Sequence, residues 1–375
     1  MALFDFISGD EFRSGLESDY QELNSCMQMG AWKAAQVLAG SIIEAILIDY
    51  LIAIEYQKLS SSEILKWDLS KAITACRGDG ILSEKTEHLS HVIRSYRNLI
   101  HPGRVVRLGE VANAQGAKIA QALVEIVIEE ISTKRREKFG YTAEQVVGKI
   151  EHDPSARAIL GYLLTRVNNV ELERLLLKII PQRYFDLMNS EKVSEKILIT
   201  LEICFRTAFD ATPLETKVKV TEKFARTIRE ESADLVWTYT FFRGKDLQYL
   251  SQEEALLVKG HFLFALDSDT TGTILKAAEG IGNFLTADET DDLTISLFYQ
   301  MLINTTPTGK KELSELAKRT LETEYRTMGD DNQKAMITAI DKMIKAFEGG
   351  NLPTALETIK EVRAILLSYS ASDKS

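Results

Sequence analysis

Apolar residues recur along most of the chain at spacings of three and four positions, and strict alternation over strand length is rare. This spacing places apolar side chains on one face of an α-helix. Only six prolines occur in 375 residues, so long helices are seldom interrupted. The pattern predicts an all-α protein.

Within the first third, apolar periodicity and the breaks in it predict a bundle of five helices. Gly30, Pro102 and Gly140 each follow or interrupt a periodic stretch, and Ser83 precedes one at the position of an N-cap. The predicted helices run over about 10–29, 31–56, 69–77, 83–100 and 112–138. We assign residues 1–140 to this first helical domain.

A domain boundary is predicted at 138–142, after which Thr142 and Gln145 have the spacing of a capping box. Residues 141–375 then read as a second all-helical domain with a possible regulatory or sensing role. Its further breaks are expected at the prolines, namely Pro154, Pro181, Pro213, Pro307 and Pro353. No fixed period accompanies them, so HEAT-like helical hairpins and an irregular bundle both remain open.

Composition excludes several classes of protein. The net charge of −10 argues against a protein that coats nucleic acid through its overall field. The three cysteines are far apart, which is not the pattern of a disulfide framework or of a four-ligand zinc site. The most apolar segment, 42–54, is interrupted by Glu44 and Asp49 and is too short to span a membrane. We therefore expect a cytoplasmic protein without a membrane segment, a metal or a cofactor.

One stretch of the first domain concentrates polar groups that can act on RNA. On a helix, the side chains of Arg94, Arg97, Asn98 and His101 share the side opposite an apolar stripe that contains Tyr96. The two guanidiniums can bind a phosphate, and the imidazole can exchange a proton near neutral pH. Phosphate binding and proton exchange are the two functions that RNA cleavage requires.

The charge around this stretch differs from that of the whole chain. Arg94, Arg97, Arg104 and Arg107 lie between His88 and Gly109 with no acidic residue among them. A local basic patch in an acidic protein is the electrostatic pattern of a nucleic-acid site. We expect Arg104 and Arg107 to contact RNA, although a solvated loop is the simpler interpretation for both.

The sequence Arg94-Ser-Tyr-Arg-Asn-Leu-Ile-His101-Pro resembles the Arg-x(4–6)-His motif of HEPN domains. Residues 35–47 resemble the apolar second helix of that family, and 69–73 and 80–84 resemble the connecting helix and the approach to the motif. The resemblance implies a helical bundle that forms a homodimer. It also implies either a metal-independent ribonuclease of toxin–antitoxin or antiviral systems, or a relative that only binds RNA or serves as an adaptor.

The resemblance also implies a role for each residue. His101 would be the general acid and base, and Arg94, with six residues between it and His101, would bind the phosphate. Arg97 and Asn98 match the polar pair of the motif, but only three residues separate Arg97 from His101, so either arginine could take the motif role. Asn98 would add a hydrogen bond, and Glu44 and Tyr96 would support the cluster.

Three interpretations follow. The first is a ribonuclease that cuts RNA, such as transfer RNA, as a homodimer, with a regulatory protein as a further partner. The second is a non-catalytic module that binds RNA or protein. In the third, the arginines pair internally with Glu44, and His101 is only a helix cap.

Other conspicuous stretches favour structural interpretations. The basic run 134–138 is expected to be a solvated helix end, and the aromatic cluster 237–242 is expected to be core. The stretch 278–283 contains glycines but lacks the lysine and the spacing of a phosphate loop.

Overall fold

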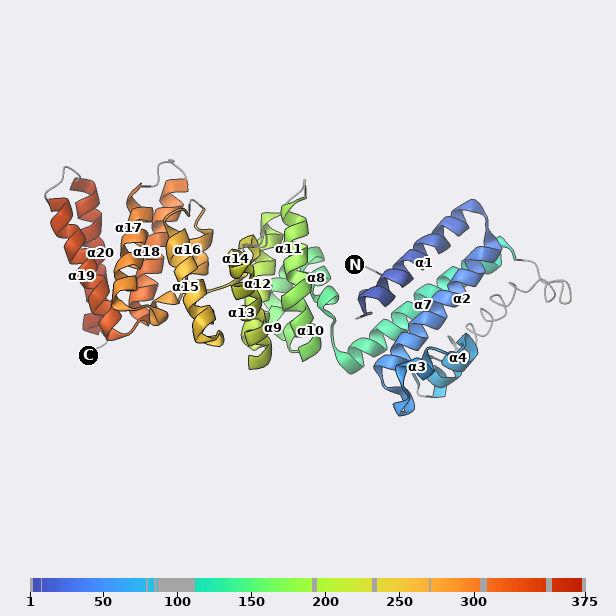
Figure 1. Cartoon of the computed structure of the whole chain (residues 1–375). Helices are drawn as coiled ribbons and strands as arrows, with labels where there is room; N and C mark the ends of the chain where they lie inside the picture. The colour runs from blue at the N-terminus through green and yellow to red at the C-terminus, as the bar shows by residue number, and fades with distance from the viewer. Residues whose placement is uncertain are drawn as a thin grey trace. The chain divides into compact units, whose positions relative to one another are not determined.

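A computed structural model describes residues 3–7, 9–78, 80–83, 86, 112–190, 194–230, 235–269, 271–303, 309–348 and 353–372. These residues form 18 α-helices and no strand, which confirms the all-α prediction. The chain divides into two compact units, Met1–Ile180 and Pro181–Ser375. Each unit is described by itself below, as the first unit and the second unit (Figure 1).

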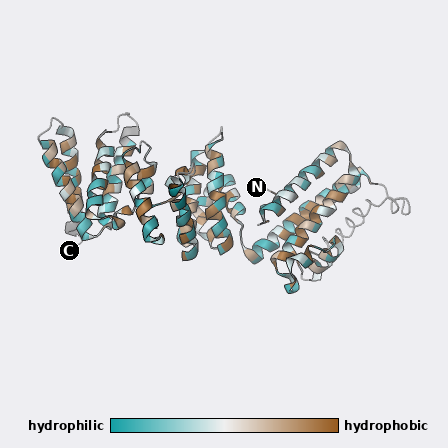
Figure 2. Ribbon diagram, in the orientation of Figure 1, coloured by the Kyte–Doolittle hydropathy of each residue, from teal (hydrophilic) through white to brown (hydrophobic). Residues whose placement is uncertain are grey.

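The first unit is built around helix α2, Trp32–Ala53, which packs against α1 (Asp10–Met29), α4 (Leu69–Gly78) and α7 (Ala114–Phe139). Hydrophobic residues run along α2 in Figure 2, and those that face its neighbours are fully buried, among them Ala39, Ile43, Ile46 and Leu47. Gly30 ends α1 in the left-handed conformation, which glycine adopts without steric cost. The short helices η1 (Tyr56–Lys58) and α3 (Ser61–Ile64) lead from α2 to α4.

By length and composition, α2 is the one helix among the described residues that could cross a membrane. Its most apolar stretch is 61% buried inside the first unit. The same apolar surface therefore serves as the centre of the bundle.

The first unit continues beyond α7 with five short helices. They are α8 (Ala143–His152), η3 (Pro154–Ile159), α9 (Leu160–Leu164), α10 (Asn169–Arg174) and the π-helical η4 (Leu175–Ile179). Thr142 and Gln145 form the predicted capping box at the start of α8. The two compact units therefore divide after Ile180, whereas the sequence analysis placed a domain boundary after residue 140.

Contacts with the N-terminal segment explain why α8 and α10 belong to the first unit. The Thr142 hydroxyl donates to the Asp5 carbonyl at 2.5 Å, and the Gln145 amide donates to the Asp5 carboxylate at 3.1 Å. Arg13 on α1 lies 2.7 Å from the Glu144 carboxylate. Arg174 on α10 lies 2.7 Å from the same carboxylate, so Glu144 joins α1 to α10.

The chain between α7 and α8 is tightly packed against the turn after α9. Gly140 has a φ of +84°, and a Cβ at this position would lie 1.9 Å from the Arg166 carbonyl oxygen. The backbone N–H of Tyr141 donates to that oxygen at 2.7 Å. Only glycine combines this backbone conformation with so close an approach.

Pro181 does not break a helix, which corrects the sequence analysis. It lies in the first turn of α11, Ile180–Met188, directly after the π-helical turn of η4. Helical backbone runs without a break from α10 through η4 into α11, so the proline is accommodated next to a π-helical turn, where the regular hydrogen-bond pattern already changes. Pro213 precedes α13 and Pro353 begins α20, as expected of helix boundaries, whereas Pro307 lies outside the described residues.

The second unit consists of stacked helical hairpins in two layers. One layer contains α13, α15, α17 and α19, each packed on the next, and the other contains α12, α14, α16, α18 and α20. Their bounds, together with the 3₁₀ helices, are α12 Glu195–Ala211, α13 Leu214–Arg229, α14 Leu235–Phe241, η5 Gly244–Tyr249, α15 Gln252–Leu266, α16 Thr273–Ala277, η6 Ile281–Phe284, α17 Ala287–Ile303, α18 Gly309–Thr327, α19 Asp330–Glu348 and α20 Pro353–Ser372.

An aromatic core joins the first hairpins of this unit. The rings of Phe205 and Phe241 stack with centroids 4.4 Å apart, and those of Phe242 and Phe262 stack at 5.2 Å. All four side chains are fully buried. Phe241 and Phe242 are therefore core residues, as the sequence predicts.

Candidate functional site

Most of the predicted Arg/His cluster lies outside the described residues. This applies to Arg94, Tyr96, Arg97, Asn98, His101, Arg104 and Arg107. Glu44 is described and lies half-buried on α2, the central helix of the first unit. The arrangement of the cluster remains a prediction, and the described residues define how the chain leads into it and out of it.

Ser83 lies before the segment that carries Arg94 to His101, which we call the motif segment. Its hydroxyl oxygen accepts from the backbone N–H of Thr86 at 3.2 Å, which is the N-cap geometry that the sequence predicts. The hydroxyls of Ser83 and Thr86 both donate to the Glu130 carboxylate, each at 2.7 Å. Glu130 lies on α7, so one carboxylate holds this helix start against the bundle.

The chain leaves the motif segment at Ala112 and enters α7 through a second cap. The Asn113 side chain accepts from the backbone N–H of Gly116 at 2.8 Å. Gly116 lies so close to α2 that a Cβ on it would be 2.3 Å from the Gln36 amide nitrogen. Both ends of the motif segment are thus attached to the α2–α7 pair.

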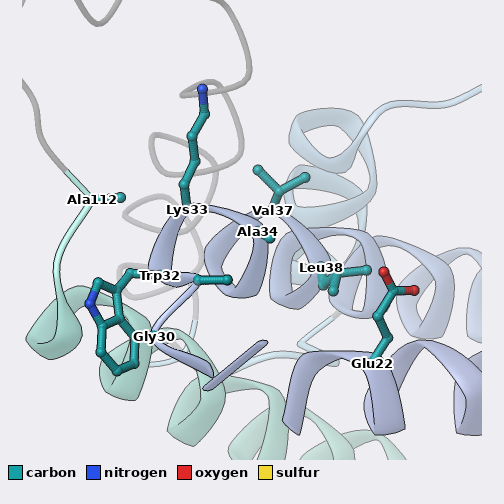
Figure 3. Close-up of a pocket in the computed structure, with 9 residues that line it drawn as sticks. Glu22, Gly30, Trp32, Lys33, Ala34, Val37, Leu38 and Ala112 are labelled. Carbon is teal, nitrogen blue, oxygen red and sulfur yellow. The ribbon is translucent and has the colours of Figure 1, made fainter. Parts of the chain in front are cut away.

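An open cavity of about 670 Å³ lies at the N-terminal end of α2, beside Ala112 (Figure 3). Val37 and Leu38 line it, Lys33 extends from α2, and Glu22 approaches from α1. Among the described residues, Lys33 has no ion-pair partner, and no acidic residue occupies the first turn of α2. Its lining therefore combines apolar side chains with one basic residue, Lys33, and one acidic residue, Glu22.

Lys134 and Lys138 of the basic run 134–138 are exposed, as predicted for a solvated helix end, but Arg135 between them is not. Arg135 is buried and pairs with the Asp49 carboxylate on α2. Burial raises the pKa of Asp49, while the nearby guanidinium of Arg135 opposes that shift. Lys134 pairs with Glu137 at 3.5 Å, and the Arg136 guanidinium lies 5.9 Å from the Tyr141 ring. The run therefore stabilises the end of α7.

A buried carboxylate that the sequence analysis missed lies in the second unit. Glu324 on α18 is fully buried and accepts from the backbone N–H groups of Gly280 at 2.5 Å and Gly282 at 2.6 Å. Burial raises the pKa of Glu324 to about 7. Two backbone donors that lie two residues apart and point at one group form a site suited to an anion. Here the Glu324 carboxylate occupies that site, and both donors belong to the stretch 278–283.

The described residues contain no group of three His, Cys, Asp or Glu side chains arranged to hold a metal ion. The three cysteines are buried and free. Burial raises the pKa of the Cys204 thiol to about 12, so this thiol is unreactive at neutral pH.

No family model, curated protein sequence or solved structure matches this chain. The resemblance to HEPN domains therefore rests on the motif and on the order of the helices around it.

Proposed function

We propose that residues 1–140, within the first unit, form a HEPN-type, metal-independent endoribonuclease that acts as a homodimer. The observation that carries the proposal is the spacing of Arg94, Arg97, Asn98 and His101 in a segment with one sign of charge. A guanidinium can stabilise the phosphate and an imidazole can exchange protons, which are the functions that RNA cleavage by the 2′-hydroxyl requires.

In this mechanism His101 takes the proton of the 2′-hydroxyl, whose oxygen attacks the adjacent phosphorus. Arg94 or Arg97 stabilises the negative charge that builds on the phosphate oxygens. The bond to the 5′-oxygen breaks, and this leaving oxygen receives a proton from an imidazolium. The products are a 2′,3′-cyclic phosphate and a free 5′-hydroxyl, and no metal ion takes part.

The described framework supports this proposal in two ways. Ser83 and Glu130 hold the start of the motif segment against α7, and Asn113 caps the helix that follows the segment. The residues that flank the predicted site are therefore held on the described helices. Glu44 lies on the central helix, where a carboxylate can orient an arginine.

The test is cleavage of total cellular RNA and transfer RNA by the full-length protein in the presence of EDTA. We expect cleavage by the wild type and a loss of at least about 100-fold in both the His101→Ala and the Arg94→Ala variants. His152→Ala is the matched control, because His152 is an exposed histidine on α8, and this variant should keep full activity.

The second candidate function is an RNA-binding module without catalysis, which the local excess of arginine favours. It predicts no cleavage, together with RNA binding that weakens in Arg94→Ala and is unchanged in His101→Ala. Equal RNA binding by the wild type and Arg94→Ala, with no cleavage by either, would contradict both functions.

A further inference from the structure

Helix α15 of the second unit exposes an unusual amount of apolar surface. Phe264 is 85% exposed, Leu256 is 55% exposed and Leu257 is 36% exposed. Leu256, Gly260 and Phe264 are spaced four residues apart and therefore lie along one side of the helix. The opposite side packs into the unit through Val258 and Phe262.

The neighbouring helix α17 continues this apolar surface. Ile295 is 50% exposed and Tyr299 is 46% exposed, and the two are again spaced four residues apart. Helices α15 and α17 pack side by side in one layer, and each also packs against a helix of the other layer. Their exposed sides therefore face the same way and form one surface. We call it the α15–α17 face, and it comprises Leu256, Leu257, Phe264, Ile295 and Tyr299.

The exposed charged residues of these two helices and of the helix end at Asp267 are all acidic. Glu253 and Asp267 lie at the two ends of the exposed side of α15, and Asp288 and Asp292 lie on the exposed side of α17. Within the described residues, none of these four carboxylates forms an ion pair.

Neither helix offers an exposed cation to neutralise them. The only lysine or arginine on α15 and α17 is Lys259. Its side chain is buried, and its ammonium donates to the Phe284 carbonyl at 3.1 Å and to the Glu289 carboxylate at 2.7 Å. Acidic residues are common in the first turn of any helix, which accounts for Glu253 and Asp288. The absence of exposed cations and the presence of Asp267 and Asp292 require a further explanation.

We propose that the α15–α17 face is a docking site for a basic amphipathic helix of a partner protein. Such a helix would place an apolar stripe against Leu256, Phe264 and Ile295, and lysines or arginines beside the flanking carboxylates. Gly260 lies between Leu256 and Phe264, and a Cβ at this position would meet nothing within 4 Å, so a second backbone has room to approach.

The charges decide against two other occupants. An anionic membrane surface would be repelled by four carboxylates on one face. A second copy of the same face would bring these carboxylates opposite one another, because a two-fold interface pairs identical surfaces. A basic helix satisfies both the apolar surface and the charges.

The test uses a fluorescein-labelled peptide of leucine and lysine of about 18 residues, long enough to form a helix, with leucine at helical spacing. Fluorescence anisotropy with the full-length protein gives its Kd. We expect Phe264→Ser to raise the Kd at least about tenfold, as the loss of a central aromatic anchor does. Asp292→Lys should raise the Kd and make it less dependent on salt. Thermal melts should be unchanged, because both side chains are exposed.

Two controls make the test specific. Phe185→Ser removes another exposed aromatic side chain, 57% exposed on α11, and should leave the Kd unchanged. A peptide with glutamate in place of lysine should not bind. The proposal is overturned if the two phenylalanine variants bind equally well or if the glutamate peptide binds as tightly as the lysine peptide. Sedimentation that shows a wild-type dimer, lost in Phe264→Ser, would equally overturn it, because the occupant would then be a second copy.

Discussion

Each unit is held together internally, and the contacts inside the two units differ in how far apart their partners lie in the sequence. In the first unit, Lys178 pairs with Asp10, 168 residues away, and Gln145 bonds to Asp5, 140 residues away. In the second unit, Lys276 pairs with Glu202, 74 residues away. The first unit closes its N-terminal segment against helices that follow α7, whereas the second adds each hairpin to the one before it.

This difference has consequences for stability. A unit that depends on long-range contacts loses its core as a whole when one of them is removed. A stacked array is stabilised by each hairpin and by its interfaces with its neighbours, so damage stays close to its origin. Substitutions in each unit test this contrast.

The largest effect is expected when Arg135 is replaced by alanine. The substitution leaves Asp49 buried without its partner, which should destabilise the first unit by about 3–5 kcal/mol. Hydrogen exchange measured by mass spectrometry should show faster exchange throughout α1 to α10, with no change in the second unit. The Arg135→Met/Asp49→Leu double variant should recover most of the loss. Faster exchange confined to α2 and α7 would contradict the expectation that the first unit unfolds as a whole.

Replacement of Gly140 by alanine should destabilise the first unit by roughly 3 kcal/mol. Alanine is strained at a φ of +84°, and its Cβ would collide with the Arg166 carbonyl. Gly148→Ala is the matched control, because Gly148 lies inside α8 with no atom within 4 Å of an added Cβ. That control should stabilise the unit by about 0.5–1 kcal/mol, and urea unfolding measures both changes. Equal destabilisation by the two substitutions would contradict the packing described for Gly140.

Replacement of Glu324 by glutamine should destabilise the second unit by about 2 kcal/mol, because an amide nitrogen cannot accept from a backbone N–H. Hydrogen exchange should rise in α16 to α19 and remain unchanged in the first unit. A rise that extends to every helix of the second unit would show that this unit also unfolds as a whole.

Glu324 also predicts a dependence on pH. Burial raises the pKa of its carboxyl in the folded state from 4.5 to about 7, so the folded protein binds this proton more tightly than the unfolded chain does. The stability that this proton contributes is complete below the unfolded pKa and is lost as the pH rises through about 7. The second unit should therefore be less stable to urea at pH 8 than at pH 6. In Glu324→Gln this difference in stability should shrink. If it is unchanged, groups other than Glu324 cause the pH dependence.

The smallest effect is expected at Gly260. Alanine there should stabilise α15 by about 0.5–1 kcal/mol, because the position is helical and open. The same substitution should weaken binding of the basic peptide if the partner backbone approaches closely. Thermal melts and anisotropy measure the two effects separately. Stabilisation without any loss of binding would place the contact of the peptide away from Gly260.

Helices α2 and α15 show that an apolar composition does not by itself predict whether a helix is buried. Both are rich in apolar residues, yet α2 is covered on several sides by α1, α4 and α7, whereas α15 leaves Phe264 and Leu256 exposed. A helix at the centre of a bundle has neighbours all around it. A helix in one layer of a stacked array is covered by the other layer on one side and by its neighbours within its own layer. The side that faces away from the other layer stays exposed.

The sequence by itself determined the local structure. The start and end of α1, the Ser83 cap and the Thr142 capping box were all predicted, because each depends on residues a few positions apart. Pro181 is the exception: a break was predicted there, but helical backbone continues through it directly after the π-helical turn of η4. The residues of the Arg/His cluster were also selected from local spacing, and their arrangement remains a prediction.

Only the tertiary structure decided which groups meet across long stretches of chain. No local pattern marks Glu130 as the partner of Ser83, 47 residues away, or Glu324 as the acceptor for Gly282, 42 residues away. The pairing with Asp49 buries Arg135, one residue of a basic run whose lysines remain exposed. Periodicity fixes which face of a helix is apolar, but the packing of distant segments decides whether that face is covered.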